Sequence, residues 1–371
     1  MNRMDRLPRL EVDADPACAR TLPAAIHRDP LWSKALVERV LARSWHVTTW
    51  ESDLPAPGAA VARTLLKGSL DEPILYSRDA AGTMRVLSNT CTHRGNLLVT
   101  EPCPSAALRC AYHGRRFAAD GTCRSAPGFE GATGFPSASD DLPTVPSGSF
   151  GPLHFASVAP AVSFDAFIAP ARRWLGWAGS ERFAFDAAAS RDYVFDAPWT
   201  LYVENYLEGL HVPFVHPALA RALDLDGYRV EPVDDAVMQI GEAATADTAL
   251  ALPADHPDAA RRVAAYYLWL FPTTMLNLYP WGLSVNLVEP IGATRTRVRF
   301  LSFVGDATRR SAGAGADLDR VEREDEAIVL RTAQGVRSRF YDRGRLAPGH
   351  EAGVLHLHRL LARHWNEAAG C

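Results

Sequence analysis

The sequence predicts an α+β fold with two main domains, an all-β unit followed by a unit that mixes helices and strands. At 371 residues the chain is long enough for two cores, since roughly 150 residues per domain is usual. Over residues 46–158, short runs such as HVTTW and MRVLSN alternate with Gly, Pro and Asp, which is typical of strands joined by turns. Over residues 159–371, helical runs such as DLDRVEREDEAIVLRTAQGV alternate with strand-like runs such as TRVRFLSFV.

Residues 1–45 form a helical segment ahead of these two domains. In RDPLWSKALVERVLARSW, residues 28–45, apolar side chains recur at helical spacing. Asp29 stands at the capping position and Pro30 in the first turn, both of which favour a helix start. We expect this segment to pack on the domain formed by residues 159–371.

The composition excludes several classes of function. Hydrophobic residues make up 47% of the chain and charged residues 22%, close to globular averages. A net charge of −4 gives no overall attraction to nucleic acid or anionic lipid. The N-terminus MNRMDRLPRLEVDADP is charged where a secretory signal is apolar, and no stretch reaches about 18 consecutive apolar residues. We expect a cytoplasmic protein that binds neither nucleic acid nor membrane.

The most specific signal is a pair of Cys/His motifs in CTHRGNLLVTEPCPSAALRCAYHG, residues 91–114. Cys91 and His93 form the first pair, Cys110 and His113 the second, and a glycine follows each pair. A structural zinc ion accepts two cysteines and two histidines, but zinc modules usually group cysteine with cysteine and histidine with histidine. An iron–sulfur cluster with histidines on one of its irons fits this arrangement better.

C-T-H-R-G and C-A-Y-H-G resemble the two ligand loops of Rieske [2Fe-2S] proteins. The resemblance implies that Cys91 and Cys110 bind one iron and that His93 and His113 bind the other. It also makes residues 46–158 the Rieske domain.

Other positions place these loops within the Rieske proteins. Respiratory relatives have an extra cysteine in each loop, whereas this chain has Asn96 and Tyr112, so the loops resemble those of oxygenases and ferredoxins. By the same resemblance, Pro127 and Gly128 belong to a third loop that covers the cluster. Arg115 departs from the pattern, because oxygenases commonly have tryptophan there, and this departure concerns the local docking surface.

A second motif lies in YVENYLEGLHVPFVHP, residues 202–217. Glu208 and His211 are three residues apart and would share one face of a helix. Pro213 would kink or end that helix and so bring His216 back toward His211. Two histidines together with one carboxylate are the ligands of non-haem iron oxygenases. Two hydrogen-bonded core histidines are the alternative, which the spacing and the preceding Rieske motifs disfavour.

The carboxylate ligand is predicted within residues 317–336. Apolar residues at helical spacing define a stripe along this segment, and Asp325 falls near its centre. A carboxylate on a buried stripe is costly unless it is paired or metal-bound, so we assign Asp325 as the third ligand. We expect the other acids of the segment to face solvent: Asp319, Glu322, Glu324 and Glu326.

The second motif resembles the Asp/Glu-x2-His-x4-His pattern of Rieske oxygenase catalytic subunits, with Glu208 where most members have aspartate. This resemblance implies that Glu208 is not an iron ligand and instead bridges His113 of one chain to His211 of the next. The family's metal aspartate lies on a late helix, which agrees with Asp325.

The resemblance covers most of the chain and implies a complete system. Residues 159–371 become a helix-grip (START-like) α+β catalytic domain with mononuclear Fe(II), beside the [2Fe-2S] cluster of the first domain. The chain resembles a terminal oxygenase that uses O2 and receives NAD(P)H-derived electrons from a separate reductase of the flavin and ferredoxin type. Electron transfer between subunits implies a ring, most often a homotrimer.

Two features of the sequence bear on the substrate. The glutamate at 208 and the chain length resemble single-subunit members that act on choline, betaines and carnitine, so we expect hydroxylation or oxidative demethylation of a quaternary ammonium compound. Aromatic faces could hold such a cation, although aromatic residues in strands more often form core. The available residues are Tyr202, Tyr206, Tyr266, Tyr267, Trp269, Phe271, Tyr279 and Trp281.

Three alternatives stay open. An aromatic or natural-product substrate is the alternative within the same enzyme class. Outside enzymology, a Rieske electron carrier or a ligand-binding module with an inactive iron site is possible. A carrier would need only the first domain, so His211, His216 and Asp325 argue against it.

Overall fold

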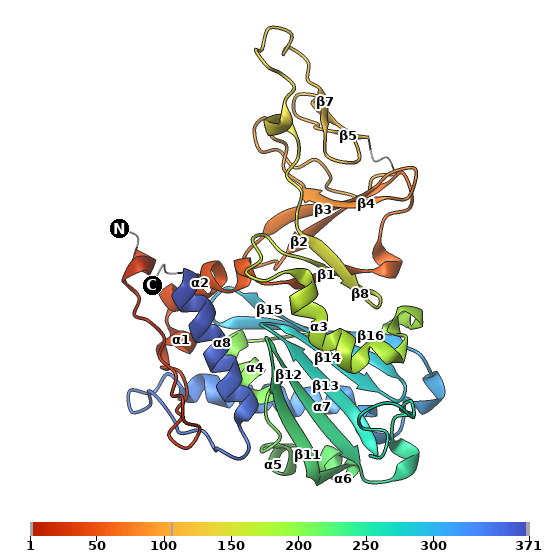
Figure 1. Cartoon of the computed structure of the whole chain (residues 1–371). Helices are drawn as coiled ribbons and strands as arrows, with labels where there is room; N and C mark the ends of the chain where they lie inside the picture. The colour runs from red at the N-terminus through yellow and green to blue at the C-terminus, as the bar shows by residue number, and fades with distance from the viewer. Residues whose placement is uncertain (1–2, 105–106, 369–371) are drawn as a thin grey trace. The chain divides into compact units, whose positions relative to one another are not determined.

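A computed structural model describes residues 3–104 and 107–368 of the chain. Contacts between Cα atoms divide it into two compact units. One unit comprises Met1–Ser44 together with Asp165–Cys371, and the other comprises Trp45–Phe164. Figure 1 shows the course of the chain, coloured from the N-terminus to the C-terminus.

The unit Trp45–Phe164 is built from three small antiparallel sheets, with strand orders β1-β9-β8, β2-β3-β4 and β5-β6-β7. Every strand-like run predicted from the sequence in this region is a strand, because short β-rich runs here are bounded by turn residues. The strands are β1 (His46–Trp50), β2 (Ala60–Leu65), β3 (Glu72–Arg78), β4 (Met84–Ser88), β5 (Leu108–Arg109), β6 (Arg116–Phe117), β7 (Cys123–Ser125), β8 (Ser147–Phe150) and β9 (Leu153–Ala156).

The core of this unit lies beside the two Cys/His motifs. Leu75, Leu87, Leu108 and Phe117 are buried in one cluster, and the same cluster contains the cysteines Cys91, Cys110 and Cys123. The short strands β5 and β6 flank the second motif. The two Cys/His motifs are therefore anchored in the hydrophobic core of this unit.

The other unit contains a seven-stranded antiparallel sheet in the order β10-β16-β15-β14-β13-β12-β11. Its central strands are buried on both faces, so they are nearly continuous apolar runs without alternation. The strands are β10 (Ala184–Phe195), β11 (Leu223–Val233), β12 (Ala236–Ala243), β13 (Val263–Leu270), β14 (Thr274–Tyr279), β15 (Gly282–Ile291) and β16 (Arg295–Val304).

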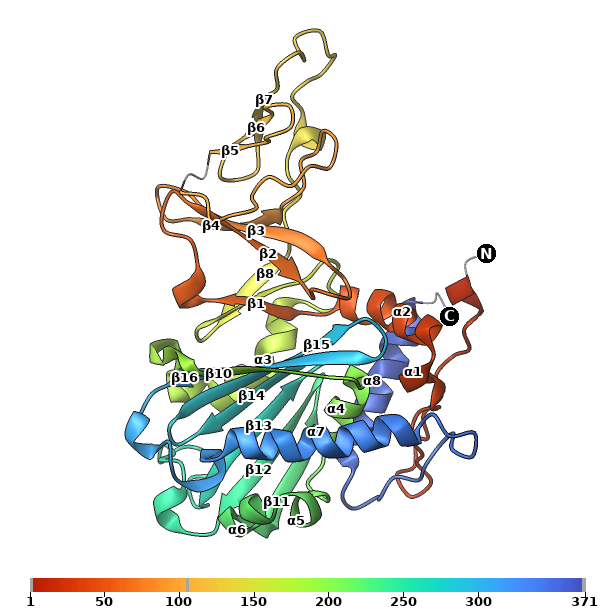
Figure 2. The same ribbon diagram turned by 180° about the vertical axis from the view of Figure 1, so that it is seen from behind.

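Helices flank this sheet, and Figure 2 shows α7 running across one of its faces. Helix α4 packs against both α7 and α8. The α-helices are α1 (Ala25–Arg28), α2 (Pro30–Arg39), α3 (Phe164–Leu175), α4 (Trp199–Tyr206), α5 (Val212–Val215), α6 (Pro217–Ala222), α7 (Leu318–Gly335) and α8 (Ala352–Ala368). An α+β fold with an all-β first unit is thus confirmed. No helix in the described part of the chain has the length and apolar character needed to cross a membrane.

The predicted N-terminal helix is shorter than expected. The Asp29 side chain accepts a hydrogen bond from the Leu31 N–H at 2.8 Å, so the predicted cap and the start at Pro30 are confirmed. The helix ends at Arg39 and a separate 3-10 turn follows, so the expected extent to residue 45 is wrong. Trp32 of α2 stacks on Trp365 of α8, with ring centroids 5.1 Å apart.

Candidate metal centres

The two Cys/His loops share one backbone hydrogen-bond pattern. The N–H groups of Cys91 and Cys110 donate to the carbonyl oxygens of Asn96 and Arg115, both at 2.8 Å. In each loop the following glycine N–H donates back to the cysteine carbonyl at 3.0 Å. Both loops therefore close in the same way, although the histidine is the second residue after the cysteine in the first loop and the third in the second.

Gly114 shows why glycine follows the second pair. Its φ of 77° lies in the left-handed region, where a Cβ is costly. A Cβ there would also stand 3.4 Å from Cγ of Pro127. The segment with Pro127 and Gly128 therefore approaches the second ligand loop, where a covering third loop was expected.

The side chains of the two loops converge. The rings of His93 and His113 have centroids 4.7 Å apart, and the thiols of Cys91 and Cys110 are hydrogen-bonded to each other. Nδ1 of His113 is buried and has no hydrogen-bond partner in the described residues. A buried nitrogen of this kind is costly unless something absent from the chain itself binds it. The four side chains therefore fit a bridging cluster.

Backbone hydrogen bonds favour the thiolate form of Cys110. Burial acts to raise the pKa of Cys110, but N–H groups of Tyr112 and His113 donate to its sulfur and bring the pKa below its usual value. Burial raises the pKa of Cys91. Because the thiolate is the metal-binding form, backbone donors at Cys110 favour ligation.

Arg115 is buried, with 2% of its surface exposed. Its guanidinium donates to Oγ1 of Thr92 at 3.0 Å and to Oδ1 of Asp140 at 3.2 Å. It also lies over the rings of Phe129 and Phe135, 4.9 and 5.1 Å from their centroids. The side chain therefore faces into the domain, and an effect of this departure on the local docking surface stays a prediction.

The chain around the second motif breaks earlier than expected. Helix α4 ends at Tyr206 and α5 spans Val212–Val215. Glu208 and His211 therefore lie in the connection between two helices and not on one helical face. Pro213 does not kink a continuous helix; it stands in the first turn of α5, where a missing N–H costs nothing.

His216 is held at the junction of α5 and α6. Its φ of −119° and ψ of 71° lie outside the helical region, which is disfavoured before a proline. Pro217 follows and begins α6. The bend turns the His216 ring into the interior, where 1% of the residue's surface is exposed.

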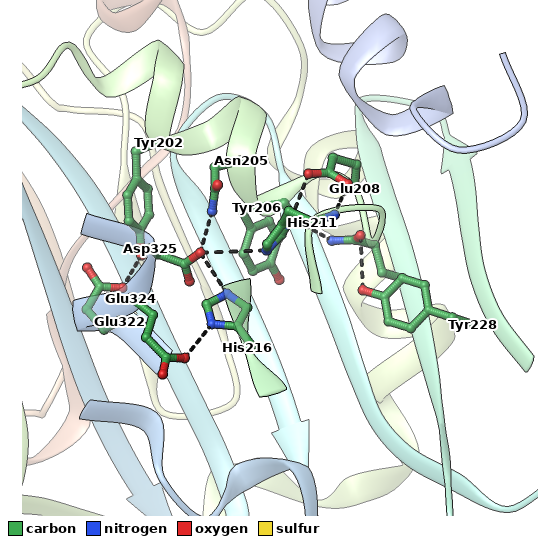
Figure 3. A network of polar contacts seen from close by, with 11 residues as sticks. Tyr202, Asn205, Tyr206, Glu208, His211, His216, Tyr228, Glu322, Glu324 and Asp325 are labelled. Carbon is green, nitrogen blue, oxygen red and sulfur yellow. Dashed lines mark hydrogen bonds and ion pairs between the residues drawn. The ribbon is translucent and has the colours of Figure 1, made fainter. Parts of the chain in front are cut away.

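The structure brings His211, His216 and Asp325 together (Figure 3). Nε2 of His216 lies 3.0 Å from Oδ1 of Asp325, and Nε2 of His211 lies 3.6 Å from the same oxygen. One ligand atom from each residue lies within 4.8 Å of the other two. Two imidazoles and one carboxylate facing a common point match the facial ligand set of non-haem Fe(II).

A carboxylate holds the far nitrogen of each histidine. Oε1 of Glu208 lies 2.6 Å from Nδ1 of His211, and Oε2 of Glu324 lies 2.8 Å from Nδ1 of His216. Metal-binding histidines usually donate their second N–H in this way. The expectation that Glu324 faces solvent is wrong: its other oxygen accepts from Nε of Arg320 at 3.0 Å.

The electrostatics of this site favour a bound cation. Burial acts to lower the pKa of His216, but Asp325 and Glu324 face the imidazole and raise its pKa above the usual value. Asn205 donates to Oδ1 of Asp325 at 2.6 Å, which leaves the carboxylate ordered. Negative charge thus converges where the three ligand atoms meet, so the residues fit a divalent iron.

Glu322 was expected to face solvent and is instead buried, with 1% exposed. The hydroxyl of Tyr202 donates to its Oε2 at 2.6 Å, and burial raises its pKa well above the usual value. The buried face of α7 runs through Glu322, Val329 and Ala333, so it is rotated from the predicted stripe. Asp319 is exposed as predicted, whereas Glu326 is largely buried.

A cavity of about 100 Å³ adjoins the three candidate ligands. Gln239, Asn277 and Asn286 contribute amides to its wall. The hydroxyl of Tyr206 donates to Oδ1 of Asn277 at 2.7 Å, and that of Tyr228 to Oε1 of Gln239 at 3.1 Å. Five tyrosines line it: Tyr202, Tyr206, Tyr228, Tyr267 and Tyr279. Four of these were among the aromatic residues considered from the sequence, and Tyr228 was missed.

Comparison with known proteins identifies the family. Residues 181–367 match the model of the ring hydroxylating alpha subunit (catalytic domain), and residues 44–144 match that of the Rieske [2Fe-2S] domain. Choline monooxygenase, chloroplastic, from Arabidopsis thaliana is 25% identical over 92% of this chain and 82% of its own length. The carnitine monooxygenase oxygenase subunit of Escherichia coli (strain K12) is 26% identical over 94% of this chain and 95% of its own.

Solved structures share the fold. The quaternary ammonium Rieske monooxygenase CntA in complex with L-carnitine has a TM-score of 0.73 at 20% identity, covering 96% of this chain and 99% of that one. Naphthalene 1,2-dioxygenase from Rhodococcus sp. bound to indole has a TM-score of 0.67 at 18% identity, covering 94% of each chain.

These matches decide among the alternatives left open by the sequence. The Rieske match identifies a [2Fe-2S] cluster and not structural zinc. The catalytic domain of this family binds mononuclear iron, takes electrons from a separate reductase, and acts on small molecules with O2. An electron carrier and a binding module are thereby excluded. The chain belongs to the ring-hydroxylating alpha-subunit family, and it is a Rieske non-haem iron oxygenase.

Proposed function

We propose that this terminal oxygenase hydroxylates or oxidatively demethylates a small quaternary ammonium compound. The observation that carries the proposal is the tyrosine-lined cavity beside His211, His216 and Asp325. Tyrosine faces attract cations by their quadrupole, most strongly where water is excluded. Relatives named as choline and carnitine monooxygenases support the same substrate class.

The charge of the cavity favours a cation with a neutral arm. Its titratable lining consists of the two histidines and three acids, Glu208, Glu322 and Asp325. Burial raises the pKa of Glu322 and favours its neutral form, so Glu208 and Asp325 supply the negative charge. The Asn286 amide lines the wall and suits a hydroxyl group, whereas the Gln239 amide is already bonded to the Tyr228 hydroxyl and the Tyr206 carbonyl oxygen. A choline-type compound therefore suits the wall better than a betaine or carnitine, whose carboxylate would face acids.

Seven residues would hold the two metal centres. Cys91, Cys110, His93 and His113 would bind the [2Fe-2S] cluster, and His211, His216 and Asp325 would bind the Fe(II). When bound, these groups supply single electrons and an open iron position for O2. Carboxylates of Glu208 and Glu324 hold the two Nδ1 protons, so both Nε2 lone pairs stay directed at the metal position.

We extend the proposal to the domains. Residues 46–158 form the Rieske domain, 159–371 the catalytic domain, and 1–45 a helical segment that packs on the latter. The division into Trp45–Phe164 and the remainder supports these limits, as does the contact between Trp32 and Trp365.

We further propose a homotrimer in which Glu208 of one chain meets His113 of the next. Glu208 already holds His211, which supports its half of the bridge. Exposed apolar residues lie near both halves, with Tyr112 beside His113, and Leu210 and Phe214 beside His211. Burial of such residues against a second copy would stabilise the ring. A flavin and ferredoxin-type reductase would supply the NAD(P)H-derived electrons.

The test uses iron-loaded holoenzyme and a panel of choline, glycine betaine, L-carnitine and benzoate. We expect choline to raise the unfolding temperature most and to be oxidised when a reductase, NADH and O2 are supplied. Iron analysis should give about three irons per chain, two in the cluster and one at the catalytic site. A response to benzoate alone would replace the proposal with an aromatic hydroxylase.

A further inference from the structure

Arg115 joins three segments around the Rieske ligands. It follows His113 by two residues, and its carbonyl oxygen accepts the Cys110 N–H at 2.8 Å. Its guanidinium donates to Oγ1 of Thr92, which stands between the ligands of the first loop, at 3.0 Å. It also pairs with Asp140, outside both loops, at 3.2 Å. A full positive charge is thus fixed inside the ligand-bearing part of the domain.

The partners of Arg115 form a compact packed unit. Thr92 donates through its hydroxyl to the carbonyl oxygen of Asp140 at 2.6 Å. The ring of Phe129 contacts both groups: its centroid lies 4.9 Å from the guanidinium and 5.3 Å from the centroid of the His93 ring. The buried charge therefore shares an aromatic neighbour with a proposed ligand.

Asp140 supplies the opposite charge. Hydrogen bonds from the Ser137 N–H lower the pKa of Asp140, and Arg115 lowers it further, so the carboxylate is ionised at neutral pH. The Ser137 N–H and hydroxyl donate to Oδ2 at 2.9 and 3.0 Å, and Arg115 donates to Oδ1. Both carboxylate oxygens accept hydrogen bonds, so the negative charge of Asp140 has a fixed position beside Arg115.

We propose that the Arg115–Asp140 pair sets the reduction potential of the Rieske cluster, with Arg115 raising the potential and Asp140 lowering it. One-electron reduction by the reductase adds one negative charge at the ligand set, and no bond is made or broken. A nearby positive charge stabilises that added charge and a negative one opposes it, most strongly where water is excluded. Arg115 acts from outside the ligand set and is a positioning residue.

The test compares reduction potentials of purified holoenzyme variants, measured by optical redox titration at one neutral pH. Arg115→Gln should shift the potential to more negative values, because Asp140 then acts alone. Asp140→Asn should shift it to more positive values. The double variant should lie between the two. Arg94→Gln is the matched control: it removes an exposed arginine from the first ligand loop and should shift the potential less than Arg115→Gln.

Opposite signs separate electrostatic tuning from a structural role, since mere loosening of the loops would move all variants in one direction. Shifts of the same sign in Arg115→Gln and Asp140→Asn, or shifts no larger than that of Arg94→Gln, would overturn the proposal. If Arg115→Gln does not assemble a cluster, Asp140→Asn and the charge-preserving Arg115→Lys decide. A positive shift in the first with a small one in the second supports the proposal, and any other result refutes it.

Discussion

Glu324 lies 2.8 Å from Nδ1 of His216 and fixes the ring whose other nitrogen faces Asp325. Glu324 and Asp325 are neighbours on α7. Asp325 faces the proposed metal position, whereas Glu324 contacts the opposite nitrogen of His216. A single helix therefore supplies both a proposed ligand, Asp325, and the group that orients a second one, His216.

Removal of this orienting group should weaken iron binding. Glu324→Ala frees the His216 ring to turn, and loss of such a partner typically costs about 10- to 100-fold in metal affinity. Competition with a chelator measures the Fe(II) affinity. Glu326→Ala is the control on the same helix, because its contact is with Arg323 at 3.7 Å. Equal affinities in both variants would show that Glu324 has no such role.

Glu208→Gln should separate metal content from electron delivery. The glutamine keeps a hydrogen-bond acceptor for His211 but loses the charge, so both metal centres should stay loaded. Reoxidation of the reduced cluster by O2 in the presence of substrate should slow by about tenfold or more. Stopped-flow absorbance follows this reaction. Glu208→Asp, which keeps the charge, should recover most of the rate; an unaffected Glu208→Gln enzyme would rule out the bridge.

Substitutions of Tyr206 distinguish substrate recognition by an aromatic ring from recognition by a hydrogen bond. Its hydroxyl donates to Asn277, and its ring lines the wall. Tyr206→Leu removes the ring and should weaken choline binding by about tenfold, because a desolvated cation–π contact contributes about 1–2 kcal/mol. Tyr206→Phe keeps the ring and should bind within about twofold of the parent. Calorimetric titration measures both, and equal losses would exclude recognition through the face.

Asp235 should stabilise the fold in a pH-dependent way. It follows β11 and accepts from Arg363 of α8 at 2.5 Å. Burial acts to raise its pKa, but the nearby His364 and the hydrogen-bonded Arg363 lower the pKa to about 2. A depressed carboxyl pKa stabilises the folded state above its unfolded value near pH 4, and this stability is lost as the pH falls toward 2.

We therefore expect Asp235→Asn to lower the free energy of unfolding by about 2 kcal/mol at neutral pH. The difference from the parent should shrink as the pH falls below about 4. Urea unfolding followed by tryptophan fluorescence measures it. Asp234→Asn is the control, because asparagine tolerates the φ of 47° at that position. A difference that is constant with pH would show that the ion pair is not responsible.

The sequence indicated the metal-site candidates more clearly than the strands of the seven-stranded sheet. Cys/His pairs and the Glu-x2-His-x4-His spacing are specific because a metal restricts both residue type and distance. Strand β13, VAAYYLWL, has no alternation because both of its faces are buried. Strand β11 is polar enough to resemble a loop. Periodicity alone therefore identifies neither strand.

Glu322 shows a different limit of sequence reasoning. It stands at helical spacing with Val329 and Ala333, but an acid at a core position reads as exposed when its partner is unknown. That partner is the Tyr202 hydroxyl, 120 residues away in the chain. Similarly, the end of α4 at Tyr206 could not be derived from Pro213, since the break precedes the proline.

The bend at His216 has a consequence for how the catalytic site acquires iron. Pro217 bars the helical conformation at His216, and the buried ring already has Glu324 behind it. Little conformational entropy is left for the ion to remove on arrival. We therefore expect the proposed iron to enter and leave a preformed site, so that a chelator removes it while the surrounding sheet stays folded.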